Sequence, residues 1–173
     1  MTRRHLILVG LPGAGKTTVG RLVAGTLNAP FVDLDAVLVR RMGMPIARIF
    51  GEHGEPRFRE FEQEAMLAAV AEPASVIATG GGWMAQAGNL DAVRAQVFVV
   101  YLKTTVAVAT RRAEEGEVRP LLQGERPEAR MAALLAEREA AYLRADAVVT
   151  NDRDMPEAAT AEVVWCAHTD AGW

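Results

Sequence analysis

Short apolar runs alternate along the chain with longer segments in which apolar residues recur at helical spacing. Five apolar runs predict β-strands, at His5–Val9, about Phe31–Asp33, Ser75–Ala78, Val97–Leu102 and Ala147–Thr150. Helices between successive strands are typical of a parallel sheet with crossover connections. We therefore predict a single α/β domain over residues 1–173, doubly wound around a five-stranded parallel sheet, and we place no domain boundary in it.

The connecting segments have the spacing of helices. Five are expected, at Lys16–Asn28, Pro56 to about Ala71, Thr105 to about Glu114, about Glu128–Arg144 and Pro156–Trp165. The buried face of the first is expected to carry Val19, Leu22, Val23 and Leu27. That of the second is expected to carry Phe58, Phe61, Ala65 and Ala68.

Two local features modify this pattern. Residues 35–50 have broken helical patterning, because Gly43 and Pro45 interrupt it. Arg59 and Glu62 lie three positions apart on a different face from the apolar stripe of their helix, so we expect them to meet at its surface.

Composition narrows the class of protein. The chain has 173 residues, half of them hydrophobic, which is enough for one buried core. A net charge of −3 argues against general nucleic-acid binding. Cys166 is the single cysteine, so no intrachain disulfide can form, and no apolar run approaches the roughly 20 residues of a membrane span. We expect a cytoplasmic, monomeric protein that binds neither nucleic acid nor membrane.

The stretch GLPGAGKTT at Gly10–Thr18 has the G-x-x-x-x-G-K-T spacing between an apolar strand and a helix. In this context the glycines let backbone N–H groups surround phosphate oxygens, and the helix N-terminus adds further donors. Lys16 would bridge the outer phosphates, and the Thr17 hydroxyl would ligate Mg²⁺. A plain glycine-rich turn would not require the Lys-Thr pair. We therefore expect nucleoside triphosphate binding by Gly13, Ala14, Gly15, Lys16, Thr17 and Thr18.

Two further motifs can carry chemistry. In VDLD, Asp33 and Asp35 lie two apart at the end of a strand, which places them on the same side. Capping of the following helix is the alternative role for Asp35. The stretch ATGGGWMA contains the glycines Gly80–Gly82, which are either slack linker or a site of close backbone approach. The strand that leads into them favours close approach.

The sequence resembles the shikimate kinase family, within the nucleoside-monophosphate-kinase-like P-loop kinases. The resemblance runs from about residue 5 to 150 and rests on motifs in a fixed order. These are GLPGAGKTTVGRLVA, FVDLD, IARIFGEHGEPRFREFE, IATGGG, VYL, RPLL and R-x-x-x-Y at Arg138–Tyr142. It implies transfer of the γ-phosphate of ATP to the 3-hydroxyl of shikimate, with Mg²⁺. It also implies a substrate-binding segment at about 33–62 and a mobile lid at about 113–127.

The resemblance also implies roles on the acceptor side. Asp35 would bind the substrate hydroxyls and orient the attacking one or take its proton. Arg59 would hold the substrate carboxylate, with Glu62 orienting it, and Arg138 would be the second carboxylate ligand. The glycines Gly80, Gly81 and Gly82 would line the same site.

On the nucleotide side, the resemblance implies that Asp33 supports Mg²⁺ through water beside Thr17. Arg119, in RPLL, would reach the transferring phosphate from the lid. Arg112 would lie over the adenine, with the loop before Pro156 on its other side. For Arg112, a surface charge cluster with its acidic and basic neighbours is the alternative. Taken alone, Arg59 and Arg138 would also be expected on a solvated helix face.

The match has two departures. The family usually has R-x-P-L-Y where this chain has Arg138-Glu-Ala-Ala-Tyr142, and an unbroken helix there could turn Arg138 away from the site. The family also has a small residue and Val after the glycines, where this chain has Trp83 and Met84. Trp83 could pack in the core or against the substrate-segment helix, or it could reshape the acceptor pocket.

Two other functions stay open at this point. One is a kinase of another hydroxy acid such as gluconate, and the other is a nucleotide-binding regulator that transfers no phosphate. The set of Asp35, Arg59, the glycines and Arg138 favours a cyclic carboxylate with several hydroxyls as acceptor.

Overall fold

The computed structural model describes residues 3–115 and 126–173. The strands are β1 (His5–Val9), β2 (Phe31–Asp33), β3 (Val76–Ala78), β4 (Val97–Lys103) and β5 (Ala147–Thr150). The α-helices are α1 (Lys16–Thr26), α2 (Leu34–Met42), α3 (Ile46–Val70), α4 (Asn89–Val93), α5 (Val106–Glu115), α6 (Pro127–Tyr142) and α7 (Pro156–Asp170). Two short 3₁₀ turns, η1 (Trp83–Ala85) and η2 (Arg94–Gln96), complete the described elements.

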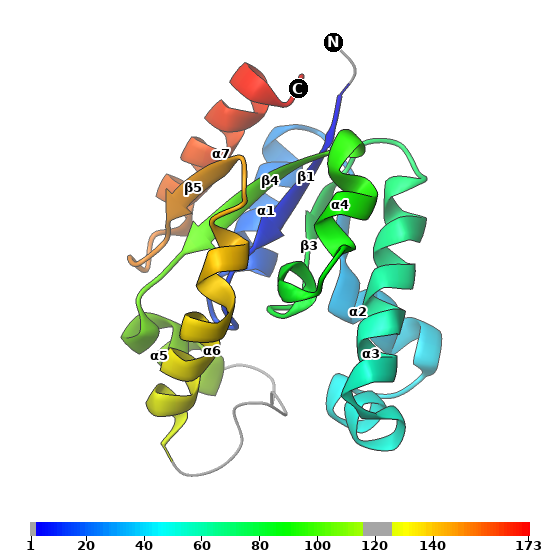
Figure 1. The fold of residues 1–173 in the computed structure, drawn as a ribbon. Helices are drawn as coiled ribbons and strands as arrows, with labels where there is room; N and C mark the ends of the chain where they lie inside the picture. Colours follow the sequence, from blue (N-terminus) through cyan, green and yellow to red (C-terminus); the bar gives the residue numbers. More distant parts are fainter. Residues whose placement is uncertain (1–2, 116–125) are drawn as a thin grey trace.

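All the strands belong to one parallel sheet with the order β2-β3-β1-β4-β5. β1 is central and pairs with β3 on one side and β4 on the other. The predicted fold class and all five predicted strands are therefore confirmed, with end shifts of one residue at β3 and β4. Because the strands are parallel, all their carboxyl ends reach the same edge of the sheet (Figure 1).

Alternation along β1 divides the core into two layers. Ile7 and Val9 belong to the cluster shared with α2, α3, α4 and α6. Leu6 and Leu8 belong to the cluster shared with α1 and α7. Successive side chains of a strand point to opposite faces, so an almost fully apolar strand is what a sheet covered on both sides requires.

The broken patterning between residues 35 and 50 separates two helices. α2 is followed by Gly43, whose φ of 67° is the left-handed conformation that suits a helix C-cap. Pro45 then precedes α3. α3 is itself interrupted at Gly54, where φ is 76° and ψ is 166°, and helical geometry resumes beside Pro56. The predicted helix start at Pro56 corresponds to this second half.

Several predicted details were wrong. Leu22 and Ala68 are exposed instead of buried, and on α3 the buried positions include Glu62 and Met66. The first helix ends two residues early, at Thr26, and the last continues to Asp170. The short helix α4 and both 3₁₀ turns were not predicted, because each is too short for a helical period to emerge.

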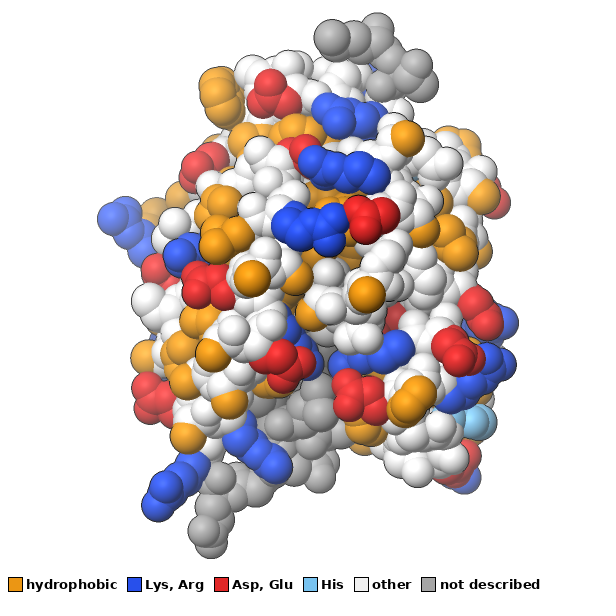
Figure 2. Space-filling view, in the orientation of Figure 1, with side chains coloured by type: hydrophobic (Ala, Val, Ile, Leu, Met, Phe, Trp, Pro, Cys, Tyr) orange, Lys and Arg blue, Asp and Glu red, His pale blue; other side chains and the backbone are white. Residues whose placement is uncertain are grey.

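The two ends of the described chain lie together at the edge of the sheet opposite the strand carboxyl ends (Figure 1). The N–H of Arg4 donates to the carbonyl of Ala171 at 3.1 Å. Acidic and basic side chains are interspersed over the face seen in Figure 2. Across the described ranges, every helix is too short or too polar to cross a lipid bilayer.

Candidate active site

The loop between β1 and α1 lies at the carboxyl edge of the sheet and is tightly packed. Gly13 and Gly15 have φ of 79° and 89°. A Cβ at Gly13 would lie 2.2 Å from the carbonyl oxygen of Ala109, and one at Gly15 would lie 2.6 Å from Nδ2 of Asn151. Glycine is required at both positions by conformation and by space.

Polar contacts hold this loop in place. The Lys16 side chain is buried, and its Nζ donates to the carbonyls of Gly10 and Leu11 at 2.9 and 2.8 Å. The Asn151 amide, which follows β5, donates to the carbonyl of Ala14 at 2.8 Å. The loop is therefore braced from across the sheet by a residue 137 positions away.

The two aspartates of the VDLD motif have separate local roles. Asp33 ends β2 and caps α2, since its Oδ1 accepts from the N–H of Ala36 at 3.2 Å. Its Oδ2 accepts from the Thr17 hydroxyl at 2.7 Å. Asp35 lies in the first turn of α2, so the expectation of a shared strand side and the alternative of an Asp35 cap are both wrong. Asp35 lines both clefts of the site.

The nucleotide-side cleft joins the phosphate loop to the aspartates. It is lined by Gly13, Gly15, Lys16, Thr17, Thr18, Asp33, Asp35, Thr79, Arg112, Ala113 and Glu115. The adjoining cleft, called the acceptor cleft below after its predicted role, shares Asp35 with the first and is smaller and more apolar. It is lined by Pro12, Asp35, Ile46, Phe50, Phe58, Arg59, Glu62, Gly80, Gly81, Gly82 and Arg138. The structure thus brings together the predicted acceptor residues from four separate segments of the chain.

Arg59 and Glu62 form a buried ion pair, which corrects the expectation of a surface contact. Nη1 of Arg59 lies 2.6 Å from Oε2 of Glu62, and the two side chains are only 11% and 1% exposed. Nη2 of Arg59 contacts Glu55 at 2.9 Å. Burial raises the pKa of Glu62, and the adjacent Arg59 guanidinium opposes that shift. The pair therefore fixes the direction of the arginine within the cleft.

The glycine triplet is packed against these side chains, so the slack-linker interpretation is wrong. A Cβ at Gly80 would lie 2.3 Å from Oε1 of Glu62, and one at Gly82 would lie 2.6 Å from the Arg59 guanidinium. At Gly81 the added atom would meet the Pro12 ring at 2.9 Å. The absence of side chains here is what lets the arginine and the glutamate approach the backbone.

Arg138 faces the acceptor cleft although its helix is unbroken. Its side chain is 4% exposed and lines the cleft beside Arg59. One turn later, the Tyr142 hydroxyl donates to the carbonyl of Gly81, which ties α6 to the glycine triplet. Burial raises the pKa of Tyr142 to about 12, so the hydroxyl stays a donor. The missing Pro-Leu pair has not displaced the arginine.

Arg112 is held by the loop that follows β5. Its Nη1 and Nη2 donate to the carbonyls of Asn151 and Arg153, each at 2.8 Å, and its side chain is 18% exposed. The neighbouring Arg111 pairs with Asp154 on the surface, and Nη2 of Arg112 also lies 3.4 Å from that carboxylate. Pro156 begins α7 just beyond this loop and does not line either cleft. Arg119 and most of the predicted lid fall outside the described residues.

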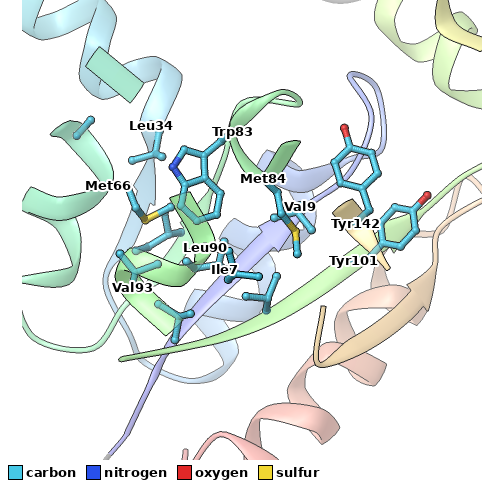
Figure 3. Packing of buried hydrophobic residues seen from close by; sticks show 14 of the residues in the cluster. Ile7, Val9, Leu34, Met66, Trp83, Met84, Leu90, Val93, Tyr101 and Tyr142 are labelled. Atoms are coloured by element: carbon cyan, nitrogen blue, oxygen red, sulfur yellow. The ribbon is translucent and has the colours of Figure 1, made fainter. Parts of the chain in front are cut away.

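Trp83 lies in the core and does not line the acceptor cleft. It is 0% exposed, and its indole packs beside Leu34 and Met66, while Met84 lies toward Val9 (Figure 3). Its Nε1 donates to Oε1 of Gln63 on α3 at 2.9 Å. Of the alternatives, packing in the core against the substrate-segment helix is correct.

Comparisons with known proteins agree with this geometry. The family model for shikimate kinase matches residues 12–167. The shikimate kinases of Geobacter metallireducens and Mycobacterium avium are each 40% identical, covering 92% and 91% of this chain and 89% and 90% of theirs. This chain belongs to the shikimate kinase family.

Solved structures of shikimate kinases also have the fold of this family member. The structure of "Shikimate kinase from Acinetobacter baumannii in complex with shikimate" is 34% identical, with a TM-score of 0.92 over 98% of this chain and 95% of that one. A gluconokinase from Sinorhizobium meliloti is 17% identical, with a TM-score of 0.68 over 98% and 94% of the two chains. That second likeness reflects the shared fold and does not favour gluconate.

Some residues of this family member's site were not predicted. Pro12, Phe50 and Phe58 line the acceptor cleft, and Thr79 lines the nucleotide side. Asn151 supports the phosphate loop. Thr79 and Asn151 each follow a predicted strand directly, so their place at the carboxyl edge of the sheet was the signal that could have found them.

Proposed function

We propose that this protein is a shikimate kinase, which transfers the γ-phosphate of ATP to the 3-hydroxyl of shikimate. The observation that carries the proposal is the acceptor cleft, which Arg59, Arg138 and Asp35 line together, while Asp35 also lines the phosphate-loop cleft. An acceptor with an acid at one end and hydroxyls at the other matches this division of charge. A regulator that transfers no phosphate would not need such a cleft.

The arginines account for recognition of the acid. Arg59 and Arg138 are both largely buried, and the Nε of each is without a hydrogen-bond partner among the described residues. A guanidinium presents a planar set of donors that matches a carboxylate. Phe50 and Phe58 add apolar walls suited to the carbon ring of a small cyclic acid.

The phosphate loop and its neighbours also fit Mg²⁺. The hydroxyl of Thr17 and the carboxylate of Asp33 lie 2.7 Å apart and are hard oxygen donors. Mg²⁺ favours one or two such protein ligands with water and substrate phosphates, in place of a cage of carboxylates. When bound, Mg²⁺ would neutralise charge on the phosphates.

The transfer step follows from the residues between the clefts. The acceptor hydroxyl oxygen forms a bond to the γ-phosphorus, the bond from that phosphorus to the β–γ bridging oxygen breaks, and ADP leaves. Asp35 orients the hydroxyl and accepts its proton. Lys16 donates to the phosphate oxygens as their negative charge shifts toward ADP. Arg112, which the loop after β5 holds in place, would lie against the adenine, near the loop before Pro156. Arg119 remains a candidate for the transferring phosphate on the family resemblance alone.

An acceptor panel tests this proposal. Purified protein is mixed with ATP, Mg²⁺ and either shikimate, gluconate or another hydroxy acid, and ADP and the phosphorylated product are measured. We expect turnover with shikimate and formation of the 3-phosphate. Turnover with gluconate alone would make it a different hydroxy-acid kinase. ATP binding without turnover on any acid would indicate a regulator.

A substitution pair tests the acid-binding role. Arg59→Lys is expected to raise the shikimate KM about tenfold or more with little change in kcat, because lysine loses the planar fork but keeps the charge. Arg57→Lys is the matched control, since Arg57 and its partner Glu60 are 51% and 59% exposed. An equal response of the two variants would contradict carboxylate binding by Arg59.

A further inference from the structure

Trp83 directly follows the glycine triplet and joins it to the helix that carries the acid-binding arginine. Its Nε1 donates to Oε1 of Gln63 at 2.9 Å. Gln63 lies on α3, four positions after Arg59, so the two share one face of the helix. The glycine next to Trp83 is Gly82, whose added Cβ would lie 2.6 Å from the Arg59 guanidinium.

Adjacent residues of the glycine segment therefore contact two α3 residues that are separated by one helical turn. Gly82 contacts Arg59, and Trp83 contacts Gln63. The turn is also fixed internally. The N–H of Trp83 donates to the carbonyl of Gly80 at 3.3 Å, and the amide of Asn89 donates to the carbonyl of Trp83 at 3.0 Å. The Trp83 side chain is 0% exposed and packs beside Leu34 and Met66 (Figure 3).

We propose that Trp83, through its hydrogen bond to Gln63, is a positioning residue for the acceptor acid. The hydrogen bond fixes the position of the glycine turn along the axis of α3 and so holds Gly82 against the Arg59 guanidinium. Any large apolar ring would fill the space that Trp83 occupies in the core. The indole N–H is directional, however, and it reaches Gln63 only when the turn lies at one position along α3. This inference rests on the proposed function, because it assigns a role within the shikimate-binding site.

Two single variants and their combination test the inference. Gln63→Met removes the acceptor from a partly exposed position and leaves the core intact, while Trp83→Phe keeps an aromatic ring but lacks the donor. Each is expected to raise the shikimate KM about three- to tenfold, the usual effect of one hydrogen bond, with kcat and the ATP KM within twofold of wild type. The double variant is expected to be no worse than the more affected single variant.

Glu64→Gln is the matched control. Glu64 is the next residue of α3, is 44% exposed and pairs with Arg41, so its substitution is expected to leave every kinetic constant unchanged. If Trp83→Phe fails to fold, Gln63→Met still decides the question. Gln63→Met with a lowered Tm but an unchanged shikimate KM would show that the hydrogen bond is structural only and would overturn the inference.

The same assay separates this inference from the proposed function. Wild-type enzyme that phosphorylates shikimate, with the KM unaffected in both variants, overturns the positioning role alone. Wild-type protein that does not phosphorylate shikimate overturns the proposed function and, with it, this inference. Equal increases in the KM of both substrates would also count against it, because the contact lies on the acceptor side.

Discussion

Replacing Gly82 by alanine would place a methyl group where the Arg59 guanidinium lies. The added Cβ would be 2.6 Å from Cζ, Nη1 and Nη2 of that side chain. The φ of Gly82 is −99°, which alanine adopts freely, so backbone strain contributes little. The effect of Gly82→Ala is therefore a displacement of the arginine.

Arg59 has little freedom to move aside. Nη1 is held by Glu62 at 2.6 Å and Nη2 by Glu55 at 2.9 Å, and the arginine side chain is only 11% exposed. Any shift away from Gly82 lengthens at least one of these charge-assisted hydrogen bonds. A hydrogen bond to a charged group contributes about 1.5–3 kcal/mol, which corresponds to roughly 10- to 150-fold in affinity.

We expect Gly82→Ala to raise the shikimate KM by about 10- to 100-fold, while the ATP KM stays within about twofold because the phosphate loop is untouched. Steady-state kinetics with each substrate varied in turn measures both constants. Gly25→Ala is the control, since among the described residues no atom lies within 4 Å of the added methyl group on α1 apart from chain neighbours and the backbone of the same helix. Its KM values should be unchanged and its Tm equal or slightly higher.

A shikimate KM within about threefold of wild type would refute this reasoning. It would mean either that Arg59 yields to the methyl group without loss of its contacts or that Arg59 does not bind the acid. Arg59→Lys separates these two explanations, because it weakens acid binding without crowding Gly82.

The remaining predictions concern three other positions. Asp35→Asn is expected to keep ATP affinity while kcat falls by about 10²-fold or more, as for loss of a positioned base; normal turnover would remove Asp35 from the mechanism. Asn151→Ala removes the 2.8 Å hydrogen bond to the Ala14 carbonyl, so titration with ATP should show severalfold weaker binding with an unchanged shikimate KM. Burial lowers the pKa of His5 below its usual 6.5, and its Nδ1 accepts from the N–H of Ser75 at 3.3 Å. The unfolded state therefore binds more protons as the pH falls below about 6.5, and stability is lost on acidification. In Tm measurements from about pH 7.5 to 5, His5→Gln should show a smaller loss than wild type, and equal slopes would contradict this.

Local pattern was sufficient for the sheet and for the phosphate loop. β1 is apolar at four of its five positions because it is buried on both faces, and the glycine and Lys-Thr spacing of the loop can be recognised from the sequence alone. Local pattern was insufficient where an element is short or where two elements meet end to end. Asp35 was placed on a strand because only three residues of β2 precede the start of α2.

The arginines show the limit of helical spacing most clearly. Spacing alone indicated that Arg59 and Glu62 could pair, yet it placed the pair at the surface. The kink at Gly54 and the packing of α3 against the glycine triplet bury Glu62 and turn Arg59 into the cleft. For Arg138, an unbroken helix could have turned the side chain either toward the cleft or away from it. The hydrogen bond from Tyr142 to the carbonyl of Gly81 shows how α6 is oriented.

The sequence by itself determined the fold class, the nucleotide loop and the family. Apolar strands, loop spacing and the order of the motifs can all be recognised from the linear sequence without knowing which segments contact one another. Only the tertiary structure decided how the acceptor cleft is assembled and how the phosphate loop is held in place. Trp83 contacts Gln63, Gly82 contacts Arg59, and Asn151 contacts Ala14 across the sheet. Such contacts depend on strand order and helix orientation, which arise from packing of the whole chain and leave no local period in the sequence.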